Sequence, residues 1–177
     1  ITVGVTLSMI AGEFDLSVGA IMAIGAFIFG AGTMAGMNPV LAVFLALAAS
    51  AILGAINGFI LILTGIPSFI VTLGTQYLYR GALYVLSTGI MLQTVGDLPV
   101  YSVFNGRMAF IADAIRGANF RTSLFWLLGV VFLVQFLLTR SRFGNHVFAT
   151  GGAKSAARAT GVSVTRTKLA CFVISGV

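Results

Sequence analysis

An apolar segment that holds no charged residue, residues 41–63, is the feature that most constrains this sequence. A helix of that length crosses the hydrocarbon core of a bilayer, which is about 30 Å thick. Of the 177 residues, 59% are hydrophobic and 8% are charged, whereas a soluble domain carries roughly a quarter charged residues. The apolar runs do not alternate with polar residues as barrel strands do. The sequence therefore predicts an all-α, polytopic transmembrane helical bundle.

Short connections divide the rest of the apolar sequence into further segments. We expect helices at residues 18–35, 41–63, 68–86 and 123–139, and partial apolar segments at 1–11 and 169–177. Pro39 suits the first turn of the helix that follows it. The prediction is about five membrane segments in a single transmembrane domain spanning residues 1–177. Because both chain ends are apolar, we interpret this domain as truncated at both ends.

A basic connection, residues 140–168, assigns a side to every other segment. It holds six of the ten Lys and Arg residues and no acid. Positive residues beside short membrane loops stay in the cytoplasm, so we place this loop inside and, by counting crossings, residues 88–122 outside. Residues 100–115 are expected to include a short interfacial helix. The +6 net charge is gathered in this loop without interleaved aromatic residues, so no nucleic-acid partner is predicted. The six basic residues are Arg140, Arg142, Lys154, Arg158, Arg166 and Lys168.

One short helix, residues 153–160, is expected inside the basic loop. Gly161 follows it at the position of a left-handed C-terminal cap. Lys154 and Arg158, four residues apart, share one face. Either the opposite face docks into a groove of another protein, or the helix is an ordinary solvated element. A phosphate-binding loop is not favoured, because its Gly-Lys-Ser/Thr order is missing. The opposite, smooth face holds Ala153, Ala156, Ala157 and Thr160.

Residues 12–17 interrupt the apolar sequence between the first two helices. Glu13 and Asp15 lie there, two of only four acidic residues. An acid at the centre of a membrane helix costs about 2.5–3.5 kcal/mol on insertion scales. Two interpretations stay open: a simple turn at the membrane surface, or a broken or re-entrant helix at depth. In the second, Ser17 would cap the next helix and Asp15 would accept hydrogen bonds from its first amides.

Two of the predicted helices carry stripes of special composition. Small residues recur every four positions in 41–63, a spacing that lets helix backbones approach closely in lipid. We expect this stripe to pack inside the subunit, with a dimer contact as the alternative, and Asn57 beside it needs a partner helix. On 68–86, polar residues face either the interior or a water-filled path; alternatively Arg80 snorkels outward and Gln76 bonds a neighbouring backbone. The stripes are Ala42, Ala46, Ser50, Gly54 and Gly58, and Thr72, Gln76, Tyr79 and Arg80.

Three separate motifs, residues 12–20, 67–81 and 143–162, resemble the permease subunits of ATP-driven (ABC) sugar importers of the ribose/xylose type. Residues 143–162 are similar to the cytoplasmic loop of that family, whose short helix is the coupling helix that docks on the ATP-binding subunit. Residues 12–20 and 67–81 are similar to two further family patterns. Glu13 and Phe14 replace the usual Gly and Ile, and Ala153 replaces the usual Asn. The matching residues are Gly151, Gly152, Ala156, Ala157, Arg158 and Gly161; Asp15 to Gly19; and Pro67, Phe69 to Thr75, Arg80 and Gly81.

The resemblance implies a multi-pass permease subunit in a bacterial inner membrane, in contact with lipid, that translocates a monosaccharide. It implies three partners: an ATP-binding subunit, a second permease subunit (identical or related) and a periplasmic sugar-binding protein. Together with the polar residues and the short helix described above, it assigns candidate roles to individual residues. Coupling to the ATPase falls to Lys154, Ala156, Ala157, Arg158 and Gly161, and the translocation path to Asp15, Ser17, Asn57, Thr72, Gln76 and Arg80.

Two other functions are alternatives. One is a permease of the same class for a branched-chain amino acid, a nucleoside or an autoinducer. The other is an intramembrane enzyme with Glu13 and Asp15 as an acid pair. Residues two apart point to different faces of a helix, and no nucleophile or metal-ligand set accompanies them. We therefore predict no catalytic residue, metal or cofactor, and we assign ATP hydrolysis to a partner because the chain lacks a nucleotide-binding motif.

Overall fold

The computed structural model describes residues 2–90, 99–108 and 120–177. Within these ranges the chain is helical apart from turns and one isolated β-bridge between Arg107 and Arg121. The observed helices are α1 (Thr2–Ile10), α2 (Val18–Met34), α3 (Pro39–Thr64), α4 (Ser68–Ser87), α5 (Pro99–Asn105), α7 (Ser123–Arg140), α8 (Arg142–Gly152), α9 (Lys154–Ala159) and α10 (Val164–Gly176).

Local sequence signals set the ends of the longest helix, α3. Asn38 accepts a hydrogen bond from the Val40 amide at 2.9 Å, and Pro39 occupies the first turn, where a missing amide hydrogen costs nothing. At the other end, Gly65 adopts φ +66° and donates to the Leu61 carbonyl, a left-handed cap that glycine tolerates best. The predicted helices 18–35, 41–63, 68–86 and 123–139 are all present, with ends shifted by at most two residues.

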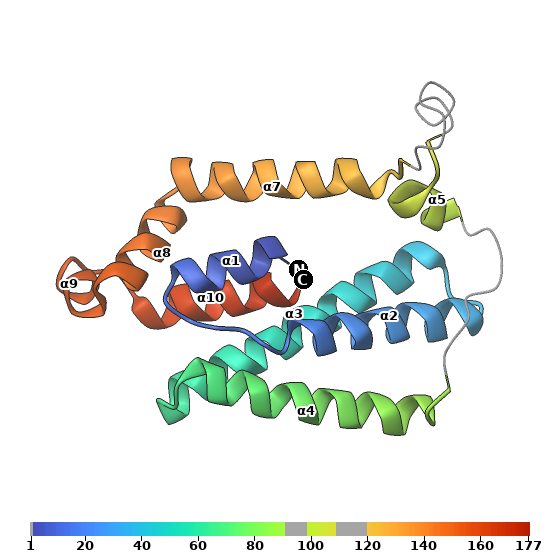
Figure 1. The fold of residues 1–177 in the computed structure, drawn as a ribbon, viewed down its shortest axis with the longest axis horizontal. Helices are drawn as coiled ribbons and strands as arrows, with labels where there is room; N and C mark the ends of the chain where they lie inside the picture. The colour runs from blue at the N-terminus through green and yellow to red at the C-terminus, as the bar shows by residue number, and fades with distance from the viewer. Residues whose placement is uncertain (1, 91–98, 109–119) are drawn as a thin grey trace.

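The first apolar segment is broken and re-entrant. In Figure 1 the two chain ends lie side by side at the centre of the molecule. From there α1 runs towards the end of the bundle that holds α9, which we call the α9 end. Residues 11–17 then turn back, and α2 starts near the centre and runs to the opposite end. Helix α10 lies along α1, and a β-carbon on Gly4 would come within 2.9 Å of the Ser175 Cα.

The small-residue stripe of α3 packs inside the chain, as predicted. A β-carbon on Gly54 would collide with the carbonyl oxygen of Phe172 in α10, and one on Gly58 would lie 3.0 Å from a Leu169 methyl group. Further along α3, the Ser50 hydroxyl would lie 2.9 Å from a β-carbon on Gly25 of α2. The stripe therefore lets α3 approach both α10 and α2 closely.

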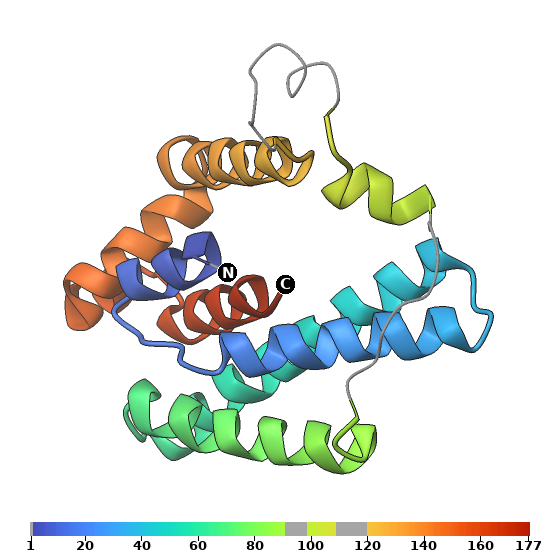
Figure 2. The same ribbon diagram turned by 45° about the vertical axis from the view of Figure 1, so that its right-hand side comes forward.

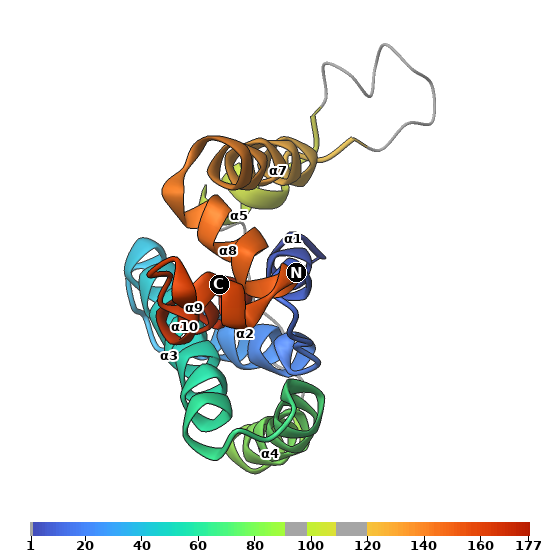
Figure 3. The same cartoon turned by 90° about the vertical axis from the view of Figure 1, so that its left-hand side faces the viewer.

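Helix α7 stands apart from α2, α3 and α4, as the turned views in Figures 2 and 3 show. Its C-terminal end joins the core through Val134 and Leu138, which pack with Leu7 of α1 and Val147 of α8. At its other end Trp126 donates to a carbonyl of α5 at 3.1 Å. Most of the side chains between these ends are exposed.

One detail of the predicted layout needs correction. The sequence predicts one short helix in the basic loop, but the structure has a second, α8, which follows α7 after Ser141 alone. The Ser141 hydroxyl caps it by accepting from the Gly144 amide at 3.1 Å. The short helix expected within 100–115 is present as α5, which ends at Asn105, and residues 109–115 lie outside the described residues.

Length and composition make this a helical membrane bundle. In the described part of the chain, two helices are long and apolar enough to cross a membrane, α3 and α7, and their apolar windows are only 17% and 11% buried in the chain. Helix α2 is apolar but one residue shorter than that limit, and α4, with 20 residues, is long enough but less apolar. Exposed apolar faces of this size are what lipid contact requires.

Candidate functional site

The break between α1 and α2 opens with a glycine turn. Gly12 has φ +80°. Its amide bonds the Met9 carbonyl, and the Glu13 amide bonds the Ser8 carbonyl, both at 3.0 Å. These two bonds close the end of α1 as a Schellman motif. Residues 13–16 are not helical, and as the chain returns towards the centre the side chains of Glu13 and Asp15 are buried while those of Phe14 and Leu16 are exposed.

Asp15 is the hub of a buried polar network. One of its carboxylate oxygens accepts from the Ser17 amide at 3.0 Å and from the Ser17 hydroxyl at 2.6 Å; the other accepts from the Ser175 hydroxyl at 3.0 Å. The predicted bond from Asp15 to an amide at the start of α2 is therefore confirmed. Ser17 holds the N-cap position but makes no side-chain cap, because its hydroxyl donates to Asp15.

Asn57 of α3 extends this network towards α4. Its amide nitrogen donates to the Ser17 hydroxyl oxygen at 2.6 Å, and the Tyr79 hydroxyl of α4 lies 3.0 Å from its amide oxygen. Asn57 therefore has the partner helices that the sequence called for. We call Asp15, Ser17, Asn57, Tyr79 and Ser175 the joint, because they connect the start of α2 to α3, α4 and α10.

The joint lies inside the bundle, which favours a break at depth over a simple turn at the membrane surface. Asp15 is 3% exposed, and Ser17 and Asn57 are fully buried. Asn57 precedes the end of α3 at Thr64 by seven residues, or about 10 Å along the helix axis. A surface turn would leave these groups in water. The chain is instead broken within the bundle, where buried polar groups need partners.

The first turn of α4 ties down the returning chain. The Ser68 hydroxyl accepts from the Phe14 amide at 2.9 Å, and the Thr72 hydroxyl accepts from the Leu16 amide at 3.2 Å. Thr72 also donates to the Ser68 carbonyl at 2.8 Å. Both hydroxyls thus satisfy backbone amides that the break takes out of helical bonding.

The remaining two candidates of the α4 stripe point elsewhere. Gln76 is half-buried and Arg80 is exposed, and neither has a hydrogen-bond partner among the described residues. Tyr77 and Tyr84 are 66% and 70% exposed. Because Tyr77, Arg80 and Tyr84 are spaced by three, four and seven residues, they share the face of α4 turned away from the joint.

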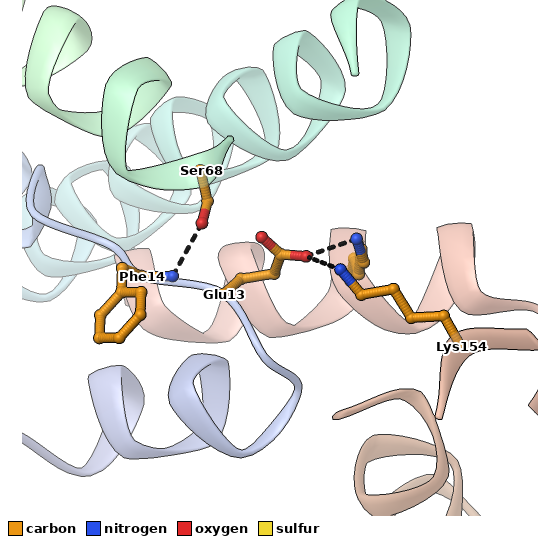
Figure 4. A network of polar contacts seen from close by, with 5 residues as sticks. Glu13, Phe14, Ser68 and Lys154 are labelled. Atoms are coloured by element: carbon orange, nitrogen blue, oxygen red, sulfur yellow. Dashed lines mark hydrogen bonds and ion pairs between the residues drawn. The ribbon is translucent and has the colours of Figure 1, made fainter. Parts of the chain in front are cut away.

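An ionic cluster of Glu13, Lys154 and Lys168 lies at the α9 end. Glu13 is 5% exposed. One of its carboxylate oxygens accepts from Lys154 at 3.2 Å and from Lys168. Figure 4 shows the Glu13 side chain pointing to Lys154 while the adjacent Phe14 amide points the other way, to Ser68. The cluster therefore links the break to α9 and α10, segments more than 140 residues away in sequence.

Contacts within this cluster shift the pKa values of Glu13 and Lys154. Burial raises the pKa of Glu13, but hydrogen bonds from Lys168, Ser68 and Lys154 outweigh it and hold the pKa below its ordinary value. The hydrogen bond to Glu13 raises the pKa of Lys154, against the opposing effect of burial. Both shifts favour the charged forms of Glu13 and Lys154.

A cleft of about 520 Å³ opens beside the ionic cluster. The α3–α4 connection forms one wall, and the start of α10 and one side of α9 form the other. We call it the basic cleft, because three cations and one carboxylate line it. These charged residues are Lys154, Arg158, Lys168 and Glu13.

Helix α9 is six residues long and ends as the sequence predicts. Gly161 has φ +84°, and the Gly161 and Val162 amides bond the Arg158 and Ala157 carbonyls at 3.0 and 2.9 Å. These bonds form a second Schellman motif. On the smooth face, Ala157 is 3% exposed and packs against the chain itself, whereas Ala156 is exposed. Ala153 and Thr160 are exposed as well, so only part of the predicted small face is open to a partner.

Several residues of these sites carry no local signal that marks them. Ser68 and Ser175 are ordinary helix serines until the break brings Phe14 and Asp15 to them. Gly151 belongs to the loop motif, but its structural role is a close contact: a β-carbon there would collide with the Ile10 carbonyl oxygen at the end of α1. The one signal of the ionic cluster in the sequence is Glu13 itself, an acidic residue at a position where the family pattern has glycine.

Comparison with known proteins covers the whole chain. Residues 1–177 match the family described as "Branched-chain amino acid transport system / permease component". The chain is 33% identical over 178 residues to the D-allose transport system permease protein AlsC of Escherichia coli (strain K12), covering 100% of this chain and 52% of AlsC. It is 32% identical over 176 residues to the ribose import permease protein RbsC of Bacillus subtilis (strain 168), covering 99% and 52%.

A third relative is the fructose import permease protein FrcC of Rhizobium meliloti, 32% identical over 174 residues, covering 97% of this chain and 47% of FrcC. The chain thus spans about half the length of these curated relatives. No solved structure matches it. The resemblance seen in the sequence motifs is confirmed, and the chain belongs to the permease-component family of the branched-chain amino acid transport type, among relatives named for sugar transport.

Proposed function

We propose that this chain is part of the permease subunit of an ABC importer that carries a monosaccharide across a bacterial inner membrane. The observation that carries the proposal is the full-chain similarity to relatives named for D-allose, ribose and fructose. The family description names branched-chain amino acids, so these are the main alternative solute. Residues 1–177 would form one transmembrane domain within the longer subunit.

The importer would have the partners that the resemblance implies. The chain carries no nucleotide-binding motif, so a separate ATP-binding subunit would hydrolyse ATP. A second permease subunit would complete the path, and a periplasmic binding protein would deliver the sugar. The positive charge of residues 140–168 supports a cytoplasmic position for the α9 end, and α9 would be the contact with the ATP-binding subunit.

Movement of α9 would reach the break through the ion pair in which Lys154 holds Glu13 at 3.2 Å. The burial of Ala157 fixes α9 to the rest of the chain. When the ATP-binding subunits close, α9 would shift and carry the break with it. The start of α2 would then change its position in the bundle, a two-state change biased by ATP. Ala156 and Arg158 offer the exposed contacts, and Gly161 fixes the end of the helix.

The exposed face of α4 is our candidate wall of the translocation path. Arg80 and Gln76 can donate to sugar hydroxyls, and the rings of Tyr77 and Tyr84 can stack on the C–H faces of a sugar ring. Tyr77 lies at the middle of α4, about 15 Å from either end. Because interfacial tyrosines gather at the ends of membrane helices, this position favours a role in the path over anchoring at the membrane surface.

The other path candidates are buried in this conformation. Asp15, Ser17, Asn57 and Thr72 bond one another or the backbone. They would meet a solute only in a state in which the joint opens. In the observed state their role is to hold the broken helix in place.

Uptake by cells that lack their own copy of the permease gene tests the proposal. The full-length permease, expressed with its ATP-binding subunit and binding protein, should restore ATP-dependent uptake of one labelled monosaccharide. Excess unlabelled leucine or isoleucine should not compete. Restored uptake of leucine, of a nucleoside or of an autoinducer, without any sugar uptake, would assign the permease to that solute instead.

A further inference from the structure

The basic cleft carries an unbalanced positive charge. Glu13 is its one acidic residue, and both lysines of the cluster already bind that carboxylate. Arg158 is exposed on the rim and has no ion-pair partner among the described residues. Two positive charges are therefore left over in a concave space of about 520 Å³.

Backbone dipoles add to this charge. The cleft is also lined by the first residues of α4 and α10, Ser68 and Val164. The N-terminal end of a helix carries a partial positive charge, and neither helix has an acidic residue in its first turn to offset it. The walls thus present cations and positive helix ends together, an arrangement that favours an anion.

We propose that the basic cleft receives an acidic side chain of the ATP-binding subunit, a contact that rests on the function proposed above. The cleft opens alongside α9, the helix that we assign to docking, and Lys154 and Arg158 of α9 form its outer edge. Lys154 has a side chain that is 51% exposed, so it can reach an incoming carboxylate. Charge complementarity of this kind sets the register and association rate of an interface.

Glu13 gives the contact an internal competitor. The incoming carboxylate would share Lys154 with Glu13, and Lys168, whose side chain is 14% exposed, would keep its hold on Glu13. Lys154 would then bridge the two carboxylates, so α9 stays connected to the break through Lys154, and α10 through Lys168. Lys154, which attracts the ATP-binding subunit, would in this way transmit the docking of that subunit to Glu13 and the chain segment that leads into the joint.

Binding of the ATP-binding subunit to the full-length permease, held in nanodiscs of zwitterionic lipid, tests the charge. Affinity should fall as salt rises, because ions screen partly exposed charges. Arg158→Gln should weaken binding roughly threefold to tenfold at low salt and flatten the salt dependence. Arg166→Gln, an exposed arginine of the same loop that does not line the cleft, should bind as the wild type does. Equal affinities of the two variants at low salt would overturn the proposal.

Glu13→Gln provides a test of opposite sign. It removes the internal competitor and adds one net positive charge, so binding at low salt should tighten. If Glu13 served only to hold α9 in place, binding would weaken instead, and that result would overturn the proposal. The proposal would also be overturned if Arg158→Gln changed only the binding of the permease to anionic lipid, because that result would assign the cleft to lipid headgroups. A wild-type permease that binds no ATP-binding subunit at any salt would refute the proposed function itself.

Discussion

Replacing Gly54 with alanine would place one methyl group where α3 crosses α10. A β-carbon on Gly54 collides with the Phe172 carbonyl oxygen and lies 3.4 Å from the Gly176 Cα. Both are backbone atoms, so they cannot rotate away as a flexible side chain can. The two helices would have to separate along the stretch that leads to Asn57 and the joint.

The size of the effect follows from two opposing contributions. Alanine is favoured over glycine in a helix by about 1 kcal/mol. Overpacking a close contact costs typically about 1–3 kcal/mol, and a collision with backbone belongs at the upper end. The net expectation is a loss of about 2 kcal/mol in the free energy of unfolding, which lowers the melting temperature by about 4–8 °C for a unit of roughly 150–250 residues and by less if the longer subunit unfolds as one unit.

Thermal unfolding of the full-length protein in detergent, followed by circular dichroism, measures this loss. Gly129→Ala is the matched control: Gly129 lies in α7, and a β-carbon there meets nothing within 4 Å. The control should melt at or slightly above the wild-type temperature. A Gly54→Ala protein that melts as high as the control would show that α3 and α10 are not in contact at this point.

Three further changes test the break and α9. The pKa of Glu13 is lowered in the folded state from its ordinary value of 4.5. The stability that ionised Glu13 contributes is therefore present above pH 4.5 and is lost as the pH falls through the folded pKa. The melting temperature of the wild type should drop on acidification below pH 4.5, and that of Glu13→Gln should drop less. Asn57→Ala removes two buried hydrogen bonds, to the Ser17 hydroxyl and to the Tyr79 hydroxyl, while Ser17 keeps Asp15 and Tyr79 keeps the Leu53 carbonyl. It should cost about 1–3 kcal/mol of unfolding free energy in denaturant titration, whereas a loss below about 0.5 kcal/mol would refute the joint. Ala157→Glu would bury a charge and should lower both melting temperature and ATP-binding-subunit co-purification, while Ser155→Glu, on the exposed side of α9, should lower co-purification alone.

The elements that follow from local chemistry could be predicted from the sequence. Apolar runs bounded by Pro39, Gly65 and Pro67 gave the long helices, because proline and glycine act on the residues next to them. The positive φ of Gly161 and the acceptor role of Asp15 beside Ser17 are likewise local. The need of Asn57 for a partner was also foreseeable, since a buried amide in a membrane helix must be bonded.

Features that depend on distant contacts could not be predicted. Helix α8 looked like a loop because Gly144, Gly151 and Gly152 lower its helix propensity. In the fold, β-carbons on the first two would collide with the Leu138 and Ile10 carbonyl oxygens, so these glycines permit close packing instead. The pairing of Glu13 with Lys154 spans 141 residues, a distance at which spacing carries no signal. Burial of Ala157 within its own chain has the same origin.

The placement of α9 against an ATP-binding subunit is tested most directly by site-specific photo-crosslinking in intact cells. A photoreactive amino acid at Ser155, exposed on α9, should form a covalent adduct with the ATP-binding subunit, and the same group at Tyr77 in the middle of α4 should not. An adduct between position 155 and the periplasmic binding protein would contradict the cytoplasmic assignment of this end. So would labelling of a cysteine at position 155 by a membrane-impermeant reagent added outside the inner membrane.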